Sequence, residues 1–183
     1  RFGSLDATSG GPQYRHADFA EIITVTNQPN PDGTASYSER AGSDWHSDGE
    51  FSPQPAAISM LYARQVPAIG GDTLFANQYL AYAALSATMR SIVDALTGIH
   101  YGKPEWRGTQ PGSPHSLART HPWSDRRSLF VSDKVVDIDG MHDGESNSLL
   151  QYLRGVATDS RLVYRHRWDP GDLLMWDNRC TLQ

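Results

Sequence analysis

The stretch "RLVYRHRWDPGDLLMW", residues 161–176, carries the clearest β pattern in the chain. Its two halves are rich in apolar, β-branched and aromatic residues, and the tetrapeptide "DPGD", residues 169–172, separates them. Proline and glycine favour a turn at that point, and the flanking residue types are those found in strands. The sequence therefore predicts that the two runs pair with each other as an antiparallel hairpin.

Other segments extend this pattern. Strands are predicted over three further stretches, residues 21–26 ("EIITVT"), 56–66 and 128–132 ("SLFVS"). Apolar residues recur at helical spacing over residues 77–96, where Ser86 is a suitable N-cap between two helical pieces, and again over residues 143–159. Residues 102–116 are rich in proline and glycine without periodicity, which predicts a loop.

Short strands separated by turns, with few helices, favour an antiparallel β architecture over alternating βαβ units. The predicted fold is therefore mainly β with flanking helices, a double-stranded β-helix (jelly roll, cupin-like). A chain of 183 residues suits one domain, 1–183. It opens without methionine and stops inside a predicted strand region, so we expect it to be incomplete at both ends.

Composition limits the classes of partner. The formal net charge is -5, which provides no basic surface for nucleic acid, so a small molecule is the more suitable ligand. No apolar run approaches the roughly 20 residues that span a bilayer, so we expect no membrane association. Cys180 is the single cysteine; this excludes an internal disulfide and is compatible with the cytoplasm.

A histidine and a carboxylate two residues apart form the main candidate site. His46 and Asp48 would point to one face of an extended segment, where both could meet one ion. Two histidines and one carboxylate on one face of a metal are typical of non-haem iron oxygenases. His16 and Asp18 repeat the same spacing, so for either pair taken alone a hydrogen-bonded surface or core pair is the favoured alternative.

Four separated blocks indicate a relationship. In order and spacing, they resemble the taurine dioxygenase and 2,4-dichlorophenoxyacetate dioxygenase family: "WHSDGEF" (45–51), "GGDTLF" (70–75), "RTHPWSDRRSLFVS" (119–132) and "YRHRWDPGDLLMWDNRCTL" (164–182). The resemblance covers most of the chain. It implies a jelly-roll fold, Fe(II) as metal and 2-oxoglutarate as co-substrate.

The resemblance also implies roles for particular residues. His46 and Asp48 match the first two iron ligands and catalytic residues of the family, whereas His16 and Asp18 match none. Thr73 matches the threonine that hydrogen-bonds the distal carboxylate of 2-oxoglutarate; the alternative is an ordinary threonine at the start of a strand.

Three aromatic residues match positions that line the pockets of the family. Trp176 corresponds to a cofactor-pocket tryptophan, and Phe51 and Phe130 correspond to substrate-pocket aromatics. Core packing is the alternative for each of them. His121 corresponds to a structural position that does not bind iron, and Asp177 and Arg179 are expected to hold a turn.

The sequence departs from the family at its last residue. The second iron-binding histidine of the family falls at Gln183, and an amide oxygen is a weaker donor than imidazole. Gln183 is a true replacement, a residue from farther along the protein, or the end of a fragment. The arginine that pairs with the distal carboxylate of 2-oxoglutarate in the family would lie beyond this point.

These features predict an Fe(II)- and 2-oxoglutarate-dependent dioxygenase. It would use O2 to hydroxylate a small organic acid of the aryloxyalkanoate, sulfonate or sulfate ester type, releasing succinate and CO2. One alternative is a catalytically silent jelly-roll protein that binds a small molecule or metal, because the distal histidine position is Gln183. Another is a cupin-like metal hydrolase. The sequence leaves the substrate open, and also whether the chain forms a homo-oligomer.

Overall fold

The computed structural model describes residues 3–6, 15–29, 32–34, 36 and 42–183. The chain divides into two compact units, residues 1–43 and 44–183, and each is treated by itself. In the described part of the first unit, one isolated antiparallel bridge joins Arg15 to Ile23. The strand predicted over residues 21–26 is therefore wrong. Its apolar side chains Ile22 and Val25 are more than half exposed, so burial against a sheet does not stabilise an extended conformation there.

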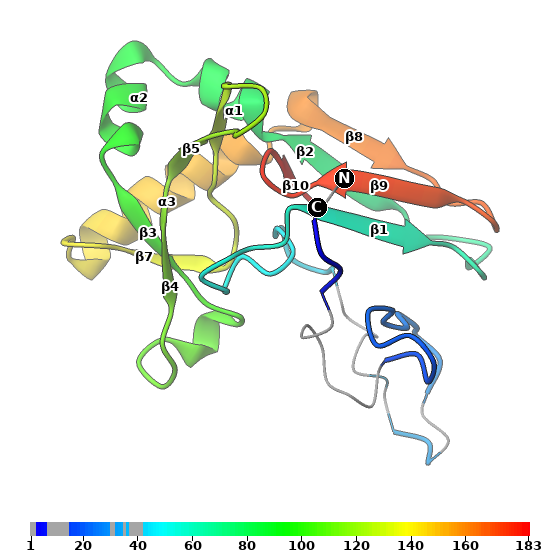
Figure 1. Cartoon of the computed structure of the whole chain (residues 1–183). Helices are drawn as coiled ribbons and strands as arrows, with labels where there is room; N and C mark the ends of the chain where they lie inside the picture. Colours follow the sequence, from blue (N-terminus) through cyan, green and yellow to red (C-terminus); the bar gives the residue numbers. More distant parts are fainter. Residues whose placement is uncertain (1–2, 7–14, 30–31, 35, 37–41) are drawn as a thin grey trace. The chain divides into compact units, whose positions relative to one another are not determined.

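The second unit is mainly β with flanking helices, as predicted. Strand β1 (Ile58–Tyr62) pairs antiparallel with β9 (Leu173–Asp177). Strand β2 (Thr73–Asn77) lies between β8 (Val163–His166) and β10 (Thr181–Leu182). These five strands extend together on one side of the unit (Figure 1). Residues 56–66 form a strand as predicted, but only β1 at their centre is regular.

The remaining strands form a three-stranded sheet and a two-stranded sheet near the helices (Figure 1). Strand β3 (Thr97–His100) lies between β4 (Ser113–Ser116) and β7 (Val135–Ile138). Strand β5 (Ala118–Thr120) pairs with β6 (Arg127–Leu129). The strand predicted over residues 128–132 is thus present, but it begins one residue earlier and ends at Leu129.

The predicted hairpin of residues 161–176 is wrong. The turn forms, with the Asp172 amide donating to the Asp169 carbonyl at 3.1 Å, but β8 pairs with β2 and β9 pairs with β1. The Gly171 amide donates instead to the Ala63 carbonyl at the end of β1. The turn therefore carries the chain from one sheet to the other, as at the corners of packed β-sheets.

The predicted loop over residues 102–116 is only partly correct. A short 3-10 helix, η2 (Pro104–Trp106), and strand β4 lie within it. Pro114 is tolerated because β4 is an edge strand. Gly112 permits close packing, since a Cβ there would lie 2.4 Å from an Ile99 methyl group. Close packing and an edge position allow a strand where periodicity gives no signal.

The helices follow their predicted ranges and caps. Helix α1 (Gln78–Ala84) and helix α2 (Ala87–Asp94) are separated at Ser86, whose side chain accepts from the Met89 amide at 3.2 Å. The Ser86 N-cap is thereby confirmed. Helix α3 (Asp143–Ala157) fills most of the predicted range 143–159, and a second short 3-10 helix, η3 (Ser160–Leu162), follows it.

The apolar core lies between the helices and the sheets. Fully buried members come from β2, α2, β6, β7, α3, β10 and the segments next to them: Ala76, Val93, Leu117, Leu129, Val131, Val135, Leu150, Leu153 and Leu182. The side chains of Ala76 and Leu182 are fully buried, so the face of the β10–β2–β8 sheet that carries them packs against this core. Side chains alternate along a strand, so Thr73 and Phe75 point to the opposite face. That second face is available for a ligand site.

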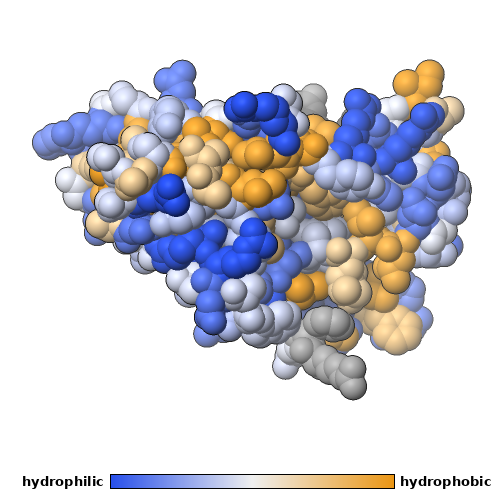
Figure 2. All heavy atoms as spheres, turned by 90° about the horizontal axis from the view of Figure 1, so that it is seen from above, coloured by the Kyte–Doolittle hydropathy of each residue, from blue (hydrophilic) through white to orange (hydrophobic). Residues whose placement is uncertain are grey.

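Apolar side chains also occur on the surface. In the view of Figure 2 they are interspersed with strongly hydrophilic residues. On β1 and β9 the exposed apolar residues are directly opposite one another, Met60 facing Met175 and Tyr62 facing Leu173. In the part of the chain that the structure describes, no helix combines the length and the apolar character needed to cross a membrane.

Candidate metal centre and co-substrate site

His46 and Asp48 lie together on an extended segment and turn that precede β1. The His46 Nε2 atom is 3.5 Å from Asp48 Oδ1, and the side chains are 22% and 36% exposed. Two ligand atoms that bind one metal ion at right angles, each about 2.1 Å away, would be about 3 Å apart. The observed separation is close to that value, so the predicted pair has the geometry to share one ion.

Hydrogen bonds orient both side chains. His46 Nδ1 donates to the Asp44 carbonyl at 2.8 Å, which fixes the ring with its Nε2 atom on the side of Asp48. The Ser59 hydroxyl donates to Asp48 Oδ2 at 2.5 Å. Burial would lower the pKa of His46, but its hydrogen bonds to Asp48 and Asp44 raise it above the ordinary value. Burial would raise the pKa of Asp48, but hydrogen bonds from His46 and Ser59 lower it.

Asn178 supports this pair, and the sequence analysis missed it. Its side-chain oxygen accepts from the Asp48 amide at 3.2 Å and from Trp176 Nε1 at 3.1 Å. Its Nδ2 donates to the Ser59 hydroxyl at 2.8 Å, so one buried amide links three parts of the site. No local pattern indicates this role, because its partners Asp48 and Ser59 are 130 and 119 residues earlier in the chain.

A buried glutamate anchors the turn that follows Asp48, and this feature was also missed. Glu50 is 1% exposed and accepts from the Ser47 amide at 3.0 Å. Its second oxygen accepts from the Ser132 hydroxyl at 2.6 Å and lies 2.7 Å from His100 Nδ1. Glutamate is rarely fully buried unless it is paired. Its partners His100 and Ser132 are 50 and 82 residues away along the chain, so neither could be identified from local sequence.

Thr73 occupies the start of β2 on the site face of the sheet. Its hydroxyl accepts from Trp168 Nε1 at 2.9 Å. A hydroxyl that accepts one hydrogen bond still has its own proton to donate. Thr73 is therefore equipped to donate to a carboxylate, the function that the resemblance implies, although it is also a threonine at the start of a strand.

Trp176 lies on the same side as the metal-ligand pair. It is directly opposite Ser59 across β1 and β9, so these two side chains share a face. Its ring is tilted against Phe75, with 5.4 Å between centroids. The tryptophan thus connects the Asp48 partners to the face of β2 that carries Thr73.

The two phenylalanines predicted to contact substrate differ from each other. Phe51 is 49% exposed, so its ring is available to a ligand. Its backbone is held in place because its carbonyl accepts from the Ser113 hydroxyl. Phe130 is 2% exposed and stacks on His100 at 4.6 Å between centroids, with the Arg119 guanidinium over its ring. This environment favours the core-packing alternative for Phe130.

His121 binds Asp177 rather than the candidate metal ligands. Its Nε2 lies 2.9 Å from Asp177 Oδ2, and Arg179 donates to the same carboxylate, so Asp177 and Arg179 hold the turn as predicted. Burial would raise the pKa of Asp177, but hydrogen bonds from Arg179 and His121 lower it to about 2. Cys180 lies near enough to His121 and Asp177 to form a cluster of three possible metal ligands. The Arg179 charge, however, already neutralises the Asp177 carboxylate.

Three further histidines also have partners of their own. His115 Nε2 bonds to the Ser52 carbonyl at 3.0 Å, and His166 Nε2 lies 3.2 Å from Asp172 Oδ2. In the first unit, His16 Nδ1 accepts from the Asp18 amide at 3.2 Å. That second histidine–aspartate pair is a local turn, with a ring nitrogen already engaged by the backbone.

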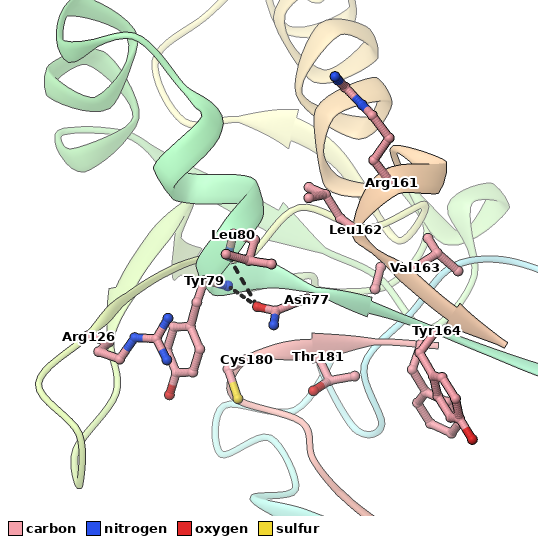
Figure 3. A pocket seen from close by; sticks show the side chains of 12 residues that line it. Asn77, Tyr79, Leu80, Arg126, Arg161, Leu162, Val163, Tyr164, Cys180 and Thr181 are labelled. Carbon is pink, nitrogen blue, oxygen red and sulfur yellow. Dashed lines mark hydrogen bonds between the residues drawn. The ribbon is translucent and has the colours of Figure 1, made fainter. Parts of the chain in front are cut away.

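A hollow of about 550 Å³ lies beside β2 and β10, and Figure 3 shows its lining residues. Tyr79 and Arg126 lie on one side, with the guanidinium 4.0 Å from the ring centroid. Thr181 comes from β10, and Cys180 immediately precedes that strand. Of the predicted site residues, none lines this hollow, so it is separate from the His46–Asp48 pair.

The strand pairing and the flanking helices define a jelly-roll protein, and the histidine–carboxylate pair on an extended segment is its candidate metal site. The chain belongs to the taurine catabolism dioxygenase TauD, TfdA family, whose pattern matches residues 1–182. The fold prediction and the resemblance to this family are thereby confirmed.

Curated relatives of known activity are similar over much of the chain. The 2,4-dichlorophenoxyacetate dioxygenase of Cupriavidus pinatubonensis, which depends on α-ketoglutarate, is 35% identical over 98% of this chain and 68% of its own length. The α-ketoglutarate-dependent sulfate ester dioxygenase of Pseudomonas putida is 30% identical over 88% of this chain and 62% of its own.

Solved structures are similar in fold. A structure of AAD-2 in complex with Mn(II) and N-oxalylglycine has a TM-score of 0.69 and 36% identity, covering 75% of this chain and 59% of that one. A taurine dioxygenase from Burkholderia xenovorans has a TM-score of 0.70 and 36% identity, covering 81% and 52%. The chain thus spans little more than half the length of these structures and about two thirds of the dichlorophenoxyacetate dioxygenase.

Proposed function

We propose that the protein is an Fe(II)- and 2-oxoglutarate-dependent dioxygenase that hydroxylates a small organic acid. The observation that carries this proposal is the His46–Asp48 pair, whose facing atoms are 3.5 Å apart in a chain of the TauD, TfdA family. Support for the co-substrate comes from relatives named as dependent on α-ketoglutarate and from the AAD-2 complex with Mn(II) and N-oxalylglycine.

The residues present suit a divalent first-row metal. His46 offers an unprotonated Nε2 once its Nδ1 donates to a carbonyl, and Asp48 offers a carboxylate oxygen. A third acceptor, Oε1 of Gln183, is buried without a hydrogen-bond partner. When bound, Fe(II) would supply the activation of O2 that couples decarboxylation of 2-oxoglutarate to oxidation of the substrate.

The protein's own groups would bind, orient and exclude water. Ser59 and Asn178 fix the Asp48 carboxylate and its backbone, and the Asp44 carbonyl fixes the His46 ring. Thr73 would donate its hydroxyl proton to the distal carboxylate of 2-oxoglutarate. The Trp176 ring would cover the site between β1 and β2 and limit water access.

The substrate class is proposed from the relatives. Their names specify a dichlorophenoxyacetate, an (S)-phenoxypropionate and a sulfate ester, all of which are small organic acids. The exposed ring of Phe51, close in sequence to the metal pair, is the aromatic residue best placed to contact such a substrate. Phe130 would act beneath the site by packing against His100. A cytoplasmic location stays a prediction, supported only by the single cysteine.

Anaerobic addition of Fe(II) and 2-oxoglutarate is expected to produce a visible charge-transfer absorption band. Chelation of the metal by the keto oxygen and adjacent carboxylate is the physical reason. Admission of O2 with a phenoxyalkanoate or an alkyl sulfate should then release succinate. A protein that binds Fe(II) without a band or succinate would instead support the silent jelly-roll alternative.

Replacement of Thr73 by valine is expected to raise the apparent KM for 2-oxoglutarate about tenfold or more, with a smaller effect on kcat. A hydrogen bond to a charged group contributes about 1.5–3 kcal/mol, which corresponds to at least that factor. Steady-state kinetics at varied 2-oxoglutarate concentration measure it. Thr73→Ser keeps the hydroxyl and should resemble the wild type, whereas Trp168→Phe tests whether loss of the Trp168 bond alone accounts for the change.

A further inference from the structure

Gln183 is held beside His46 by the backbone. The His46 amide donates to the Gln183 carbonyl and the Gln183 amide donates to the His46 carbonyl, each at 2.9 Å. Two residues that exchange both bonds are directly opposite in an antiparallel ladder, so their side chains leave on the same face. The preceding Leu182 side chain is fully buried in the core, which directs Gln183 to the other face.

The two ends of the Gln183 amide have different surroundings. The side chain lies near Asp48 and helps to lower the pKa of that carboxyl, and its Nε2 is the end of the amide that can donate to a carboxylate. Oε1 is buried and has no hydrogen-bond partner. An acceptor left unsatisfied in a buried position costs free energy unless a donor or a cation occupies the space beside it.

Three electron-pair donors are therefore available on this face: His46 Nε2, a carboxylate oxygen of Asp48 3.5 Å from it, and Oε1 of Gln183, the residue directly opposite His46. The nearby polar groups that touch Asp48, Ser59 and Asn178, are engaged in the bonds that orient it. A cation is the species that satisfies three such acceptors at once.

We propose that the amide oxygen of Gln183 is the third protein ligand of the metal, completing a set of one imidazole and two oxygen donors. This inference rests on the proposed function, because it concerns the same metal. An oxygen-rich set is harder than two imidazoles with one carboxylate, so it favours Mn(II) relative to Co(II) or Ni(II). The protein would bind such borderline metals more weakly than a site with a second histidine.

Metal titration of three variants tests the ligand directly, without turnover. Gln183→Ala should weaken Mn(II) binding about tenfold to 100-fold, monitored by the electron paramagnetic resonance signal of free Mn(II). Gln183→His should tighten Co(II) binding by a similar factor and raise the preference for Co(II) over Mn(II). Gln183→Glu keeps the size of the side chain and adds an anionic oxygen, so it should tighten Mn(II) binding.

The matched control is Gln151→Ala, which removes an exposed glutamine from α3 and should leave Mn(II) affinity unchanged. Thermal unfolding without metal checks that each variant is folded. If Gln183→Ala is unfolded, the Gln183→His and Gln183→Glu affinities still decide, since a merely structural glutamine predicts no ordered change in metal preference.

Counting imidazoles provides a second readout. Electron spin echo modulation of bound Cu(II) should report one coordinated imidazole in the wild type and two in Gln183→His. Two imidazoles in the wild type would overturn the proposal, because another histidine would then be the third ligand.

The failure of this inference is distinguishable from failure of the proposed function. If Asp48→Ala abolishes Mn(II) binding while Gln183→Ala binds as the wild type does, Gln183 is not a ligand and the metal site remains. If Asp48→Ala also binds normally, the metal site itself is wrong and both proposals fail.

Discussion

Asp48→Ala is expected to abolish Fe(II)-dependent succinate formation and to weaken metal binding by at least about 100-fold. Asp48 supplies the carboxylate of the set, and its charge offsets that of the cation. The Ser59 hydroxyl, which donates to this carboxylate, is neutral and cannot replace its charge. Coupled measurement of succinate release and Mn(II) affinity tests the expectation.

The chain offers a matched control for this variant. Asp18 stands two residues after His16, as Asp48 does after His46, but its amide bonds to the His16 ring in a local turn. Asp18→Ala should therefore leave both metal affinity and succinate formation unchanged. Equal losses in the two variants, or retained activity in Asp48→Ala, would remove Asp48 from the ligand set.

Glu50→Ala is expected to lower the free energy of unfolding by about 3–5 kcal/mol. The Glu50 carboxylate accepts from the Ser132 hydroxyl and the Ser47 amide and pairs with His100 at 2.7 Å. His100 is fully buried, and its Nε2 already has no hydrogen-bond partner. Removal of the carboxylate would leave both ring nitrogens unsatisfied in the core, which urea denaturation should detect.

A series of variants separates the buried pair from a general effect of charge. Glu105→Ala removes an exposed glutamate of η2 and should change the free energy of unfolding by no more than about 0.5 kcal/mol. Glu50→Gln keeps an acceptor and should be less destabilising than Glu50→Ala. Replacing both partners, as Glu50→Met with His100→Phe, should recover part of the loss. A Glu50→Ala protein as stable as the wild type would contradict this account.

The helices illustrate what local pattern can predict. Apolar spacing and a single serine were enough to place α1, α2 and the Ser86 cap, because caps and helix faces depend on residues a few positions apart. The same is true of α3. The His46–Asp48 pair was also identifiable, since a spacing of two residues puts both side chains on one face of an extended segment.

Strand partners illustrate what local pattern cannot predict. The residues of β8 and β9 were recognised as strands, but their pairing with β2 and β1 depends on segments about 90 to 115 residues earlier in the chain. Strand β4 gave no periodic signal because it has only four residues, SPHS, and none of them is a typical strand former. Its Pro114 is tolerated because β4 lies at a sheet edge, which only the tertiary structure shows. The strand predicted over residues 21–26 had suitable residue types, but in the described part of the first unit its pairing is limited to the isolated bridge between Arg15 and Ile23.

The sequence by itself determined the class of fold, the helices and the Ser86 cap, the family and the two neighbouring metal-ligand candidates. Each of these depends on short-range spacing or on residue blocks that can be compared directly. Only the tertiary structure decided which strands pair, that Glu50 is buried against His100, and that Gln183 lies opposite His46 with an unpartnered oxygen. Such contacts join distant residues through hydrogen bonds and burial, which no local periodicity encodes.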